Sequence, residues 1–162
     1  KKDKYELIAK YFNKSNEVFF SFISGQVLDA IVVGILTSIA MSVIGVKYSV
    51  LLGFLIGLFN LIPYFGAIIA VTVAILITIF TGGIGQAIVM AIVVIILQQI
   101  DANIINPKII GGSLSISPLL VIFSVTVGGA YFGVLGMFLA VPIFTVIKLL
   151  IEEYIEYKSS TI

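Results

Sequence analysis

The sequence contains no cysteine and no histidine, and only 10% of its 162 residues are charged. The first absence excludes disulfide bonds, thiolate catalysis and imidazole metal sites. The low charge excludes a water-soluble domain, because a water-facing surface of this size needs many more charged side chains. With 60% hydrophobic residues and a mean hydropathy of +1.26, the chain is predicted to be an all-α integral membrane protein.

The few charges lie mostly near the two ends, at 1–17 and 148–158. Between them are only Asp29, Lys47, Asp101 and Lys108. Placing both termini in the cytoplasm leaves Lys47 as the one external lysine, as the positive-inside rule requires. The net charge of +1 indicates no nucleic-acid partner, and the polar, lysine-rich start predicts no cleavable signal peptide.

The uncharged stretch Tyr48–Phe80 is too long for one simple membrane helix. As a straight helix its 33 residues would reach about 50 Å, against a hydrocarbon core of about 30 Å. Its middle carries Asn60-Leu-Ile-Pro63-Tyr-Phe-Gly66, where proline removes a backbone donor and glycine tolerates unusual conformations. A break inside a bilayer must be buried in protein or face water, so this motif predicts either a transport site or an ordinary kink or loop.

The rest of the chain divides around this break into four regions. We expect an amphipathic surface helix at 1–17, a span and broken hairpin at 18–83, a second span, loop and broken hairpin at 84–158, and a short terminus at 159–162. In the first half, the predicted elements are a span at Phe19–Gly45, a turn at Lys47-Tyr48, two arms at Tyr48–Ile62 and Gly66–Thr81, and a turn at Thr81–Gly85. In the second half, they are a span at Gln86–Ile105, a loop at Asn106–Pro118, an arm at Leu119–Val127 and an interruption at Gly128–Gly133. A helix then runs from Val134 through Pro142 into an acidic tail.

This order, span then broken hairpin, occurs twice with the spans in opposite directions, which predicts an inverted repeat. Two short echoes agree: Gln26-Val-Leu-Asp29-Ala resembles Gln98-Gln-Ile-Asp101-Ala, and Tyr64-Phe-Gly66 recurs as Tyr131-Phe-Gly133. Inverted repeats with discontinuous helices are a common plan of secondary transporters. The broken hairpins are either re-entrant or fully spanning. Asp29 lies early in its span and Asp101 late, which a strict inversion would not produce.

Asp29 and Asp101 are the first candidates for binding an ion. A charged carboxylate at the bilayer centre costs about 2.5 kcal/mol or more. Gln26 and Gln98 each precede an aspartate by three residues and share its helix face, and Asn103 adds polarity near Asp101. The alternative is structural, with each aspartate near the interface or pairing with a helix end.

Asn60, with Pro63 and Gly66, is the first candidate for binding a solute. Its amide offers a donor and an acceptor beside freed backbone carbonyls, although it could instead cap a half-helix. We include Asn106 in the candidate site, and its neighbour Lys108 is expected to anchor the loop at the cytoplasmic face or, alternatively, to pair with Asp101. Gly53 and Gly57, like Gly129 and Gly133, have small-xxx-small spacing and are expected to serve close packing. The predicted hinge or tip of the second hairpin consists of Gly128, Gly129 and Gly133.

Catalysis has little support. The sequence offers no serine–histidine or cysteine–histidine pair, no carboxylate pair in a protease setting and no phosphate-binding glycine loop. We therefore predict no catalytic residue, no metal site and no cofactor.

Several motifs together resemble the C-terminal half of the autoinducer-2 exporter family, the PerM-like permeases of bacteria. The resemblance covers nearly the whole chain, in the family's order. The matching segments are Gly57-Leu-Phe-Asn60-Leu-Ile-Pro63-Tyr-Phe-Gly66, Asp101-Ala-Asn103-Ile-Ile-Asn106-Pro107-Lys108-Ile-Ile-Gly111, Ser117-Pro118-Leu119, Gly128-Gly129, Phe132-Gly133-Val-Leu-Gly136 and Leu139-Ala-Val-Pro142.

The resemblance implies a multi-pass permease of the bacterial cytoplasmic (inner) membrane that exports a small polar solute such as autoinducer-2. It also implies coupling to protons or sodium and a homo-oligomer, for example a pentamer. Some members are proposed sodium(lithium)/proton antiporters, which is the first alternative, and a non-transporting assembly subunit is the second. Family members are about twice as long, so this chain is a fragment, a shortened version or a natural half-length member. A shared site requires Asn60 and Asp101 to lie within about 15 Å of each other, since side-chain contacts reach only a few ångströms.

Overall fold

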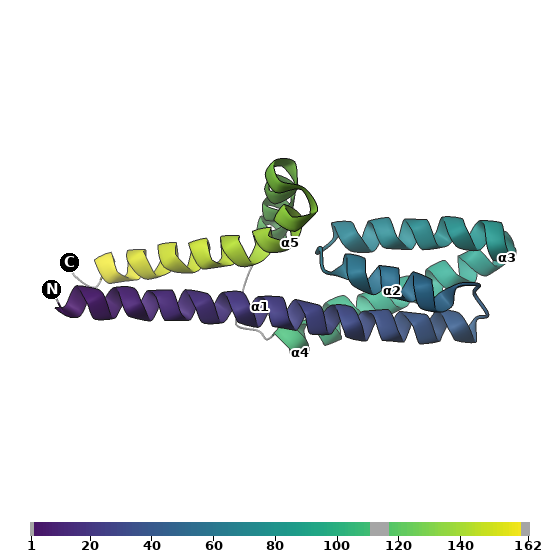
Figure 1. Cartoon of the computed structure of the whole chain (residues 1–162), viewed down its shortest axis with the longest axis horizontal. Helices are drawn as coiled ribbons and strands as arrows, with labels where there is room; N and C mark the ends of the chain where they lie inside the picture. Colours follow the sequence, from purple (N-terminus) through teal and green to yellow (C-terminus); the bar gives the residue numbers. More distant parts are fainter. Residues whose placement is uncertain (1, 111–116, 160–162) are drawn as a thin grey trace. The chain divides into compact units, whose positions relative to one another are not determined.

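The computed structural model describes residues 2–110 and 117–159, and almost all of this length is helical. Three stretches are long and apolar enough to cross a membrane: Tyr11–Val43, Phe65–Ile110 and Pro118–Glu152. The predicted all-α membrane architecture is confirmed. In order, the elements are α1 (Lys2–Val43), α2 (Ser49–Asn60), α3 (Phe65–Ile100), the π-helical turn η1 (Asp101–Ile105), α4 (Asn106–Ile110) and α5 (Pro118–Ser159) (Figure 1).

The helix α1 is continuous where two elements were expected. The surface helix predicted at 1–17 and the span predicted from Phe19 form one helix with no break. The sequence from Lys10 to Ser24 contains neither proline nor glycine, so nothing in it ends a helix.

The chain folds as two compact units. One comprises 25–113 and holds α1 from Gly25 onward, α2, α3, η1 and α4. The other comprises 1–24 and 114–162 and holds the start of α1 together with α5.

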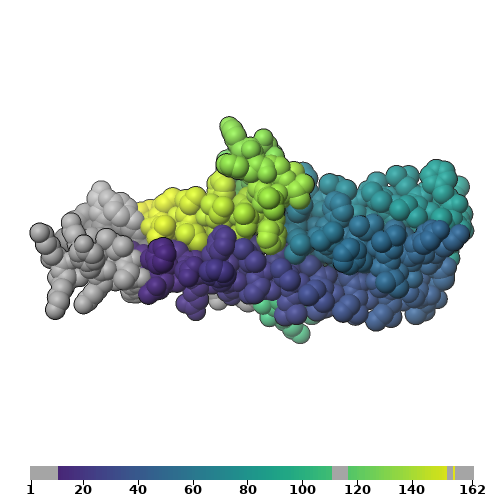
Figure 2. Space-filling view, in the orientation of Figure 1, coloured from purple at the N-terminus to yellow at the C-terminus, as the bar shows by residue number. Residues whose placement is uncertain are grey.

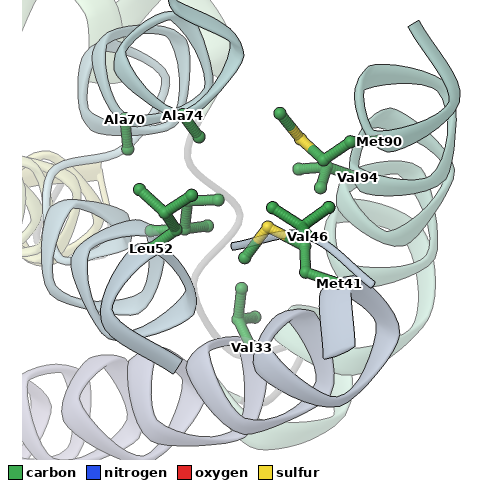
Figure 3. Packing of buried hydrophobic residues seen from close by; sticks show 9 residues of the cluster. Val33, Met41, Val46, Leu52, Ala70, Ala74, Met90 and Val94 are labelled. Carbon is green, nitrogen blue, oxygen red and sulfur yellow. The ribbon is translucent and has the colours of Figure 1, made fainter. Parts of the chain in front are cut away.

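The core of the 25–113 unit lies between α1, α2 and both arms of α3. In Figure 3 the side chains of Val33, Leu52, Ala74 and Met90 point toward a common centre, and each is at most 4% exposed. Between membrane helices there is little hydrophobic driving force, so close packing of this kind carries the association. The cluster's buried members are Val33, Met41, Val46, Leu52, Ile56, Ala70, Ala74, Met90 and Val94.

Glycines let α1 and α2 approach closely. A Cβ at Gly57 would lie 2.5 Å from the Ala30 carbonyl oxygen and 2.8 Å from the Gly34 Cα, and one at Gly53 would lie 2.6 Å from the Ser38 backbone nitrogen. These neighbours are backbone atoms that cannot move aside. Figure 2 shows the side chains of this part of α1 and of α2 in close contact along the face it presents. The packing role predicted for the glycines of α2 is confirmed.

The break at Pro63 separates α2 from α3, as predicted. α2 ends at Asn60, α3 begins at Phe65, and Tyr64 between them has a positive φ of 65°. Gly66 has a different role from the conformational freedom expected of it: a Cβ there would overlap the Phe59 carbonyl oxygen. The glycine therefore allows the two arms to turn back tightly on each other.

A second break divides α3 at the predicted Thr81–Gly85 turn. Gly83 has φ 83° and ψ 170°, a conformation open essentially only to glycine. The arms 65–82 and 84–100 flank this glycine. Gln86, just beyond it, donates from Nε2 to the carbonyl oxygens of Ile44 at 3.3 Å and Gly45 at 3.0 Å, which ties the break to the turn after α1.

In the other unit α5 is broken at Gly133, where φ is 63° and ψ is −148°. The interruption predicted over Gly128–Gly133 is thus confined to its last residue. Gly128 stays helical and packs between the arms, because a Cβ there would lie 2.7 Å from the Ala140 Cβ. Close packing explains this glycine, and chain reversal explains Gly133.

The loop predicted for Asn106–Pro118 was wrong at its start. Residues Asn106–Ile110 form the short helix α4, directly after η1. Pro107, the second residue of α4, follows η1 directly and has no N–H to give to the preceding helical turn. The predicted loop residues 111–116 lie outside the described part of the chain.

Candidate functional site

The carboxamide of Asn60, the last residue of α2, joins aspartates from two other segments. Its Nδ2 donates to Asp29 Oδ2 at 3.0 Å and to Asp101 Oδ2 at 3.3 Å. Asp29 lies on α1 and is 0% exposed, and Asp101 begins η1 and is 7% exposed. One amide therefore bridges two buried carboxylates that are far apart in the sequence.

Two further amides complete the network. Gln26, on α1, is buried, and its Nε2 donates to the backbone carbonyl oxygen of Asn60 at 2.8 Å. This bond satisfies one of the carbonyls left unpaired at the end of α2. Asn106 Nδ2, on α4, donates to Asp29 Oδ2 at 3.1 Å. We call the five residues the carboxylate cluster: Gln26, Asp29, Asn60, Asp101 and Asn106.

Chain direction explains why the two aspartates meet. Asp29 lies near the beginning of the part of α1 that belongs to this unit, whereas Asp101 follows the second arm of α3. That arm returns toward the end of the unit where the α1 part begins, so a residue early in one helix lies beside a residue late in the other (Figure 1). A strict inverted repeat would place both aspartates at equivalent positions of their spans. Because Asp29 lies early in its helix and Asp101 late, the two carboxylates meet at the same end of the unit.

The cluster has more acceptors than donors. Asp29 Oδ1 and Asp101 Oδ1 are buried and have no hydrogen-bond partner among the described residues. The two carboxyl groups lie close together, because both accept from the same Asn60 nitrogen. Lys108 is exposed on α4, and in the described part of the chain it forms no ion pair with either aspartate. Because a buried charge is stable only when paired, this arrangement suits a proton or a small cation.

The remaining predicted site residues lie outside the cluster. Asn103 is exposed, and its Nδ2 donates to the Gln99 carbonyl oxygen of its own helix at 2.7 Å. Gln98 has a buried Nε2 without a partner among the described residues. Pro63 and Gly66 shape the turn after Asn60 and contribute no side-chain hydrogen bond. The glycines of α5, Gly128, Gly129 and Gly133, belong to the other unit.

Two features were not anticipated from the sequence. The first is the role of Gln86, which the sequence could have indicated because Gln86 is a single amide directly after the glycine turn of an apolar run. The second is the π-helical turn η1, which the sequence could have indicated because Pro107 follows Asp101 closely. An apolar groove of about 410 Å³ also lies between α1 and α2, lined in part by Ala30, Gly34 and Phe54, and no member of the carboxylate cluster lines it.

Comparisons with known proteins identify the family of the chain. The family model described as "AI-2E family transporter" matches residues 2–156. The chain is 32% identical over 98% of its length to "Putative transport protein YrrI" of Bacillus subtilis and 33% identical over 91% of its length to "Putative permease PerM" of Escherichia coli. It spans 47% and 42% of these two relatives, less than half of each. No solved structure matches the chain.

Proposed function

Because the chain belongs to the AI-2E transporter family, we propose that it is the solute- and ion-binding part of a secondary transporter in the bacterial cytoplasmic membrane. The transporter exports a small polar solute such as autoinducer-2, coupled to protons or sodium. Asn60, at the end of α2, binds the solute, and Asp101 with Asp29 binds the coupling cation.

The carrying observation is that Asn60 donates to both carboxylates from one nitrogen. The residue assigned to the solute is therefore in direct contact with the residues assigned to the ion. A cation that binds the free Oδ1 atoms of Asp29 and Asp101 changes the charge of the carboxylates to which the Asn60 amide donates at Oδ2. Ion binding therefore affects how Asn60 is held for the solute, and the coupling free energy between two such sites acts on both equally.

Asp101→Asn tests this assignment. The substitution keeps the side-chain shape but removes the charge, so the protein should fold and insert while transport loses its dependence on pH and sodium. Export of autoinducer-2 from vesicles with imposed proton or sodium gradients measures this. Asn103→Ala is the matched control, since Asn103 is exposed on the same helical segment and bonds only within it. Unaltered gradient dependence in Asp101→Asn would refute the coupling role.

A sodium(lithium)/proton antiporter is the second candidate. It is favoured by the two unpartnered Oδ1 atoms, because hard cations prefer oxygen ligands and a carboxylate can exchange such a cation for a proton. Growth of a sodium-sensitive strain on high salt, compared with export of autoinducer-2, separates the two candidates. Rescue of growth without any solute export would replace the first proposal by the second.

The positions of the lysines support cytoplasmic termini. Lys47 lies in the turn between α1 and α2, whereas Lys108 lies on α4, beyond the carboxylate cluster. The cluster would then face the cytoplasmic half of the membrane. Single cysteines at these two positions test the orientation, since a membrane-impermeant thiol reagent added to intact cells should label Lys47→Cys and spare Lys108→Cys.

A further inference from the structure

The π-helical turn η1 is the irregular backbone element of the carboxylate cluster. It is closed by the Asn106 N–H, which donates to the carbonyl oxygen of Asp101 five residues earlier. Pro107 supplies a physical reason for the wide turn. In a regular α-helix its ring would clash with the carbonyl of Asn103, four residues earlier, and it has no N–H to offer that carbonyl. Single π turns of this kind are rare in proteins overall, and those that occur are frequently located at functional sites.

The wide turn decides which way Asn106 points. In an α-helix, residues five apart differ by about 140° around the axis, which puts them on nearly opposite faces. In a π turn the N–H of one bonds to the carbonyl of the other, so the two residues lie above each other. Asp101 and Asn106 therefore share a face, and both reach the cluster, one at Asn60 and the other at Asp29.

We propose that η1 is the moving part of the site and switches between a π and an α register. In the π register Asn106 closes on Asp29. In the α register the same side chain is turned by about 100°, the step of one residue, and leaves the Asp29 carboxylate open. This inference rests on the proposed function, because it supplies the opening step that a transporter needs on one side of its site.

The contact between α4 and α1 makes the two registers distinguishable. Gly25 on α1 is buried, and a Cβ built there lies 3.2 Å from Ile110 Cγ1 and 3.4 Å from Ile110 Cα. A change of register rotates α4 and moves Ile110 away from this position. Disulfide bonds require Cβ atoms about 3.5–4.5 Å apart, so cysteines at 25 and 110 are suited to bond in the π register.

The first test locks the register. The 162 residues contain no cysteine, so an introduced pair has no background within them. In the whole protein, Gly25→Cys with Ile110→Cys should form a disulfide under mild oxidation, lower autoinducer-2 export and sodium efflux at least tenfold, and recover both on reduction. The control pair is Ser42→Cys with Ser49→Cys, whose hydroxyl oxygens are 2.8 Å apart across the turn between α1 and α2. Its disulfide should change transport less than twofold. Undiminished transport with the 25–110 disulfide formed would overturn the proposal.

The second test shifts the register. Pro107→Ala restores the N–H and removes the ring clash, so the α register becomes more populated. Disulfide formation at 25–110 should then slow at least fivefold, while formation at 42–49 keeps its rate. An unchanged rate at 25–110 would show that Pro107 does not hold the π turn, and would overturn the switch.

The two tests separate this inference from the proposed function. If the reduced double-cysteine protein moves neither autoinducer-2 nor sodium, while the parent protein does, the substitutions themselves are harmful. Ile110→Ala, which loosens the contact with Gly25, then replaces the disulfide pair as the test variant. If the parent protein also moves neither, the proposed function fails. The disulfide rates with and without Pro107→Ala then still decide whether η1 changes register.

Discussion

Replacing Asn60 by leucine tests the carboxylate cluster most directly. The leucine side chain has a similar size and is compatible with the helix end. It removes the amide that donates to Asp29 and Asp101 but keeps the backbone carbonyl that accepts from Gln26. The end of α2 therefore remains satisfied, and the variant should fold and insert.

The expected magnitude follows from what each carboxylate loses. A hydrogen bond to a charged group contributes about 1.5–3 kcal/mol. Asp29 Oδ2 retains its bond from Asn106, whereas Asp101 Oδ2 loses the one donor it has among the described side chains. The 3.0 Å bond to Asp29 is partly replaceable and the 3.3 Å bond to Asp101 is long. Together they should contribute about 2–4 kcal/mol to the charged pair.

At about 1.4 kcal/mol per factor of ten, this corresponds to a loss of about 30- to 700-fold in a rate or affinity that needs both carboxylates charged. The assay is initial export of autoinducer-2, and of sodium, from vesicles with equal amounts of folded protein. Asn103→Leu is the control and should stay within about twofold, because its amide bonds only to its own helix. Transport by Asn60→Leu within threefold of the parent would refute the role given to the cluster.

Three stability predictions follow from the glycines and from Gln86. Gly57→Ala should lower the free energy of unfolding by about 1–3 kcal/mol, because its Cβ would meet α1 backbone atoms. Gly85→Ala is the control: a Cβ there would meet no described atom, so thermal stability in detergent should be unchanged or higher. Gly133→Ala should destabilise by about 1–3 kcal/mol through backbone strain alone, since its φ is 63° and, among the described residues beyond its chain neighbours, no atom lies within 4 Å of the new Cβ. A thermal shift no larger than that of Gly85→Ala would contradict this. Gln86→Leu should speed proteolysis or amide exchange in the turn after α1 by removing its two amide bonds, and unchanged protection there would show that Gln86 does not hold the turn.

The breaks in the helices were predictable because their causes are local. A proline ends a helix through its own ring, and a glycine adopts a positive φ through its missing Cβ. The positions of Pro63 and of the turn around Gly83 could thus be predicted from the uncharged runs and these residues alone. Local chemistry does not say which of several neighbouring glycines reverses the chain, and in α5 only Gly133 does so.

The composition of the carboxylate cluster was harder to predict, because it depends on which faces of three segments meet. The i, i+3 spacing of Gln26 and Asp29 indicated a shared face, and both do contact Asn60. Asn103 and Asn106 had equal standing in the sequence. The π turn separates them, since it turns Asn106 toward Asp29 and leaves Asn103 exposed. A one-residue irregularity of this kind has no periodic signal.

The choice of partners in the cluster bears on what it can do. If a lysine bonded to the two aspartates, the site would carry its own counter-charge, and breaking a buried pair costs about 3–5 kcal/mol. Asn60 and Asn106 supply neutral donors instead. They hold the carboxylates in place without cancelling their charge, and no described lysine pairs with either of them. Under the proposed function the balancing charge is the transported proton or sodium ion, which can leave the site again, whereas the partner in a structural ion pair stays in place.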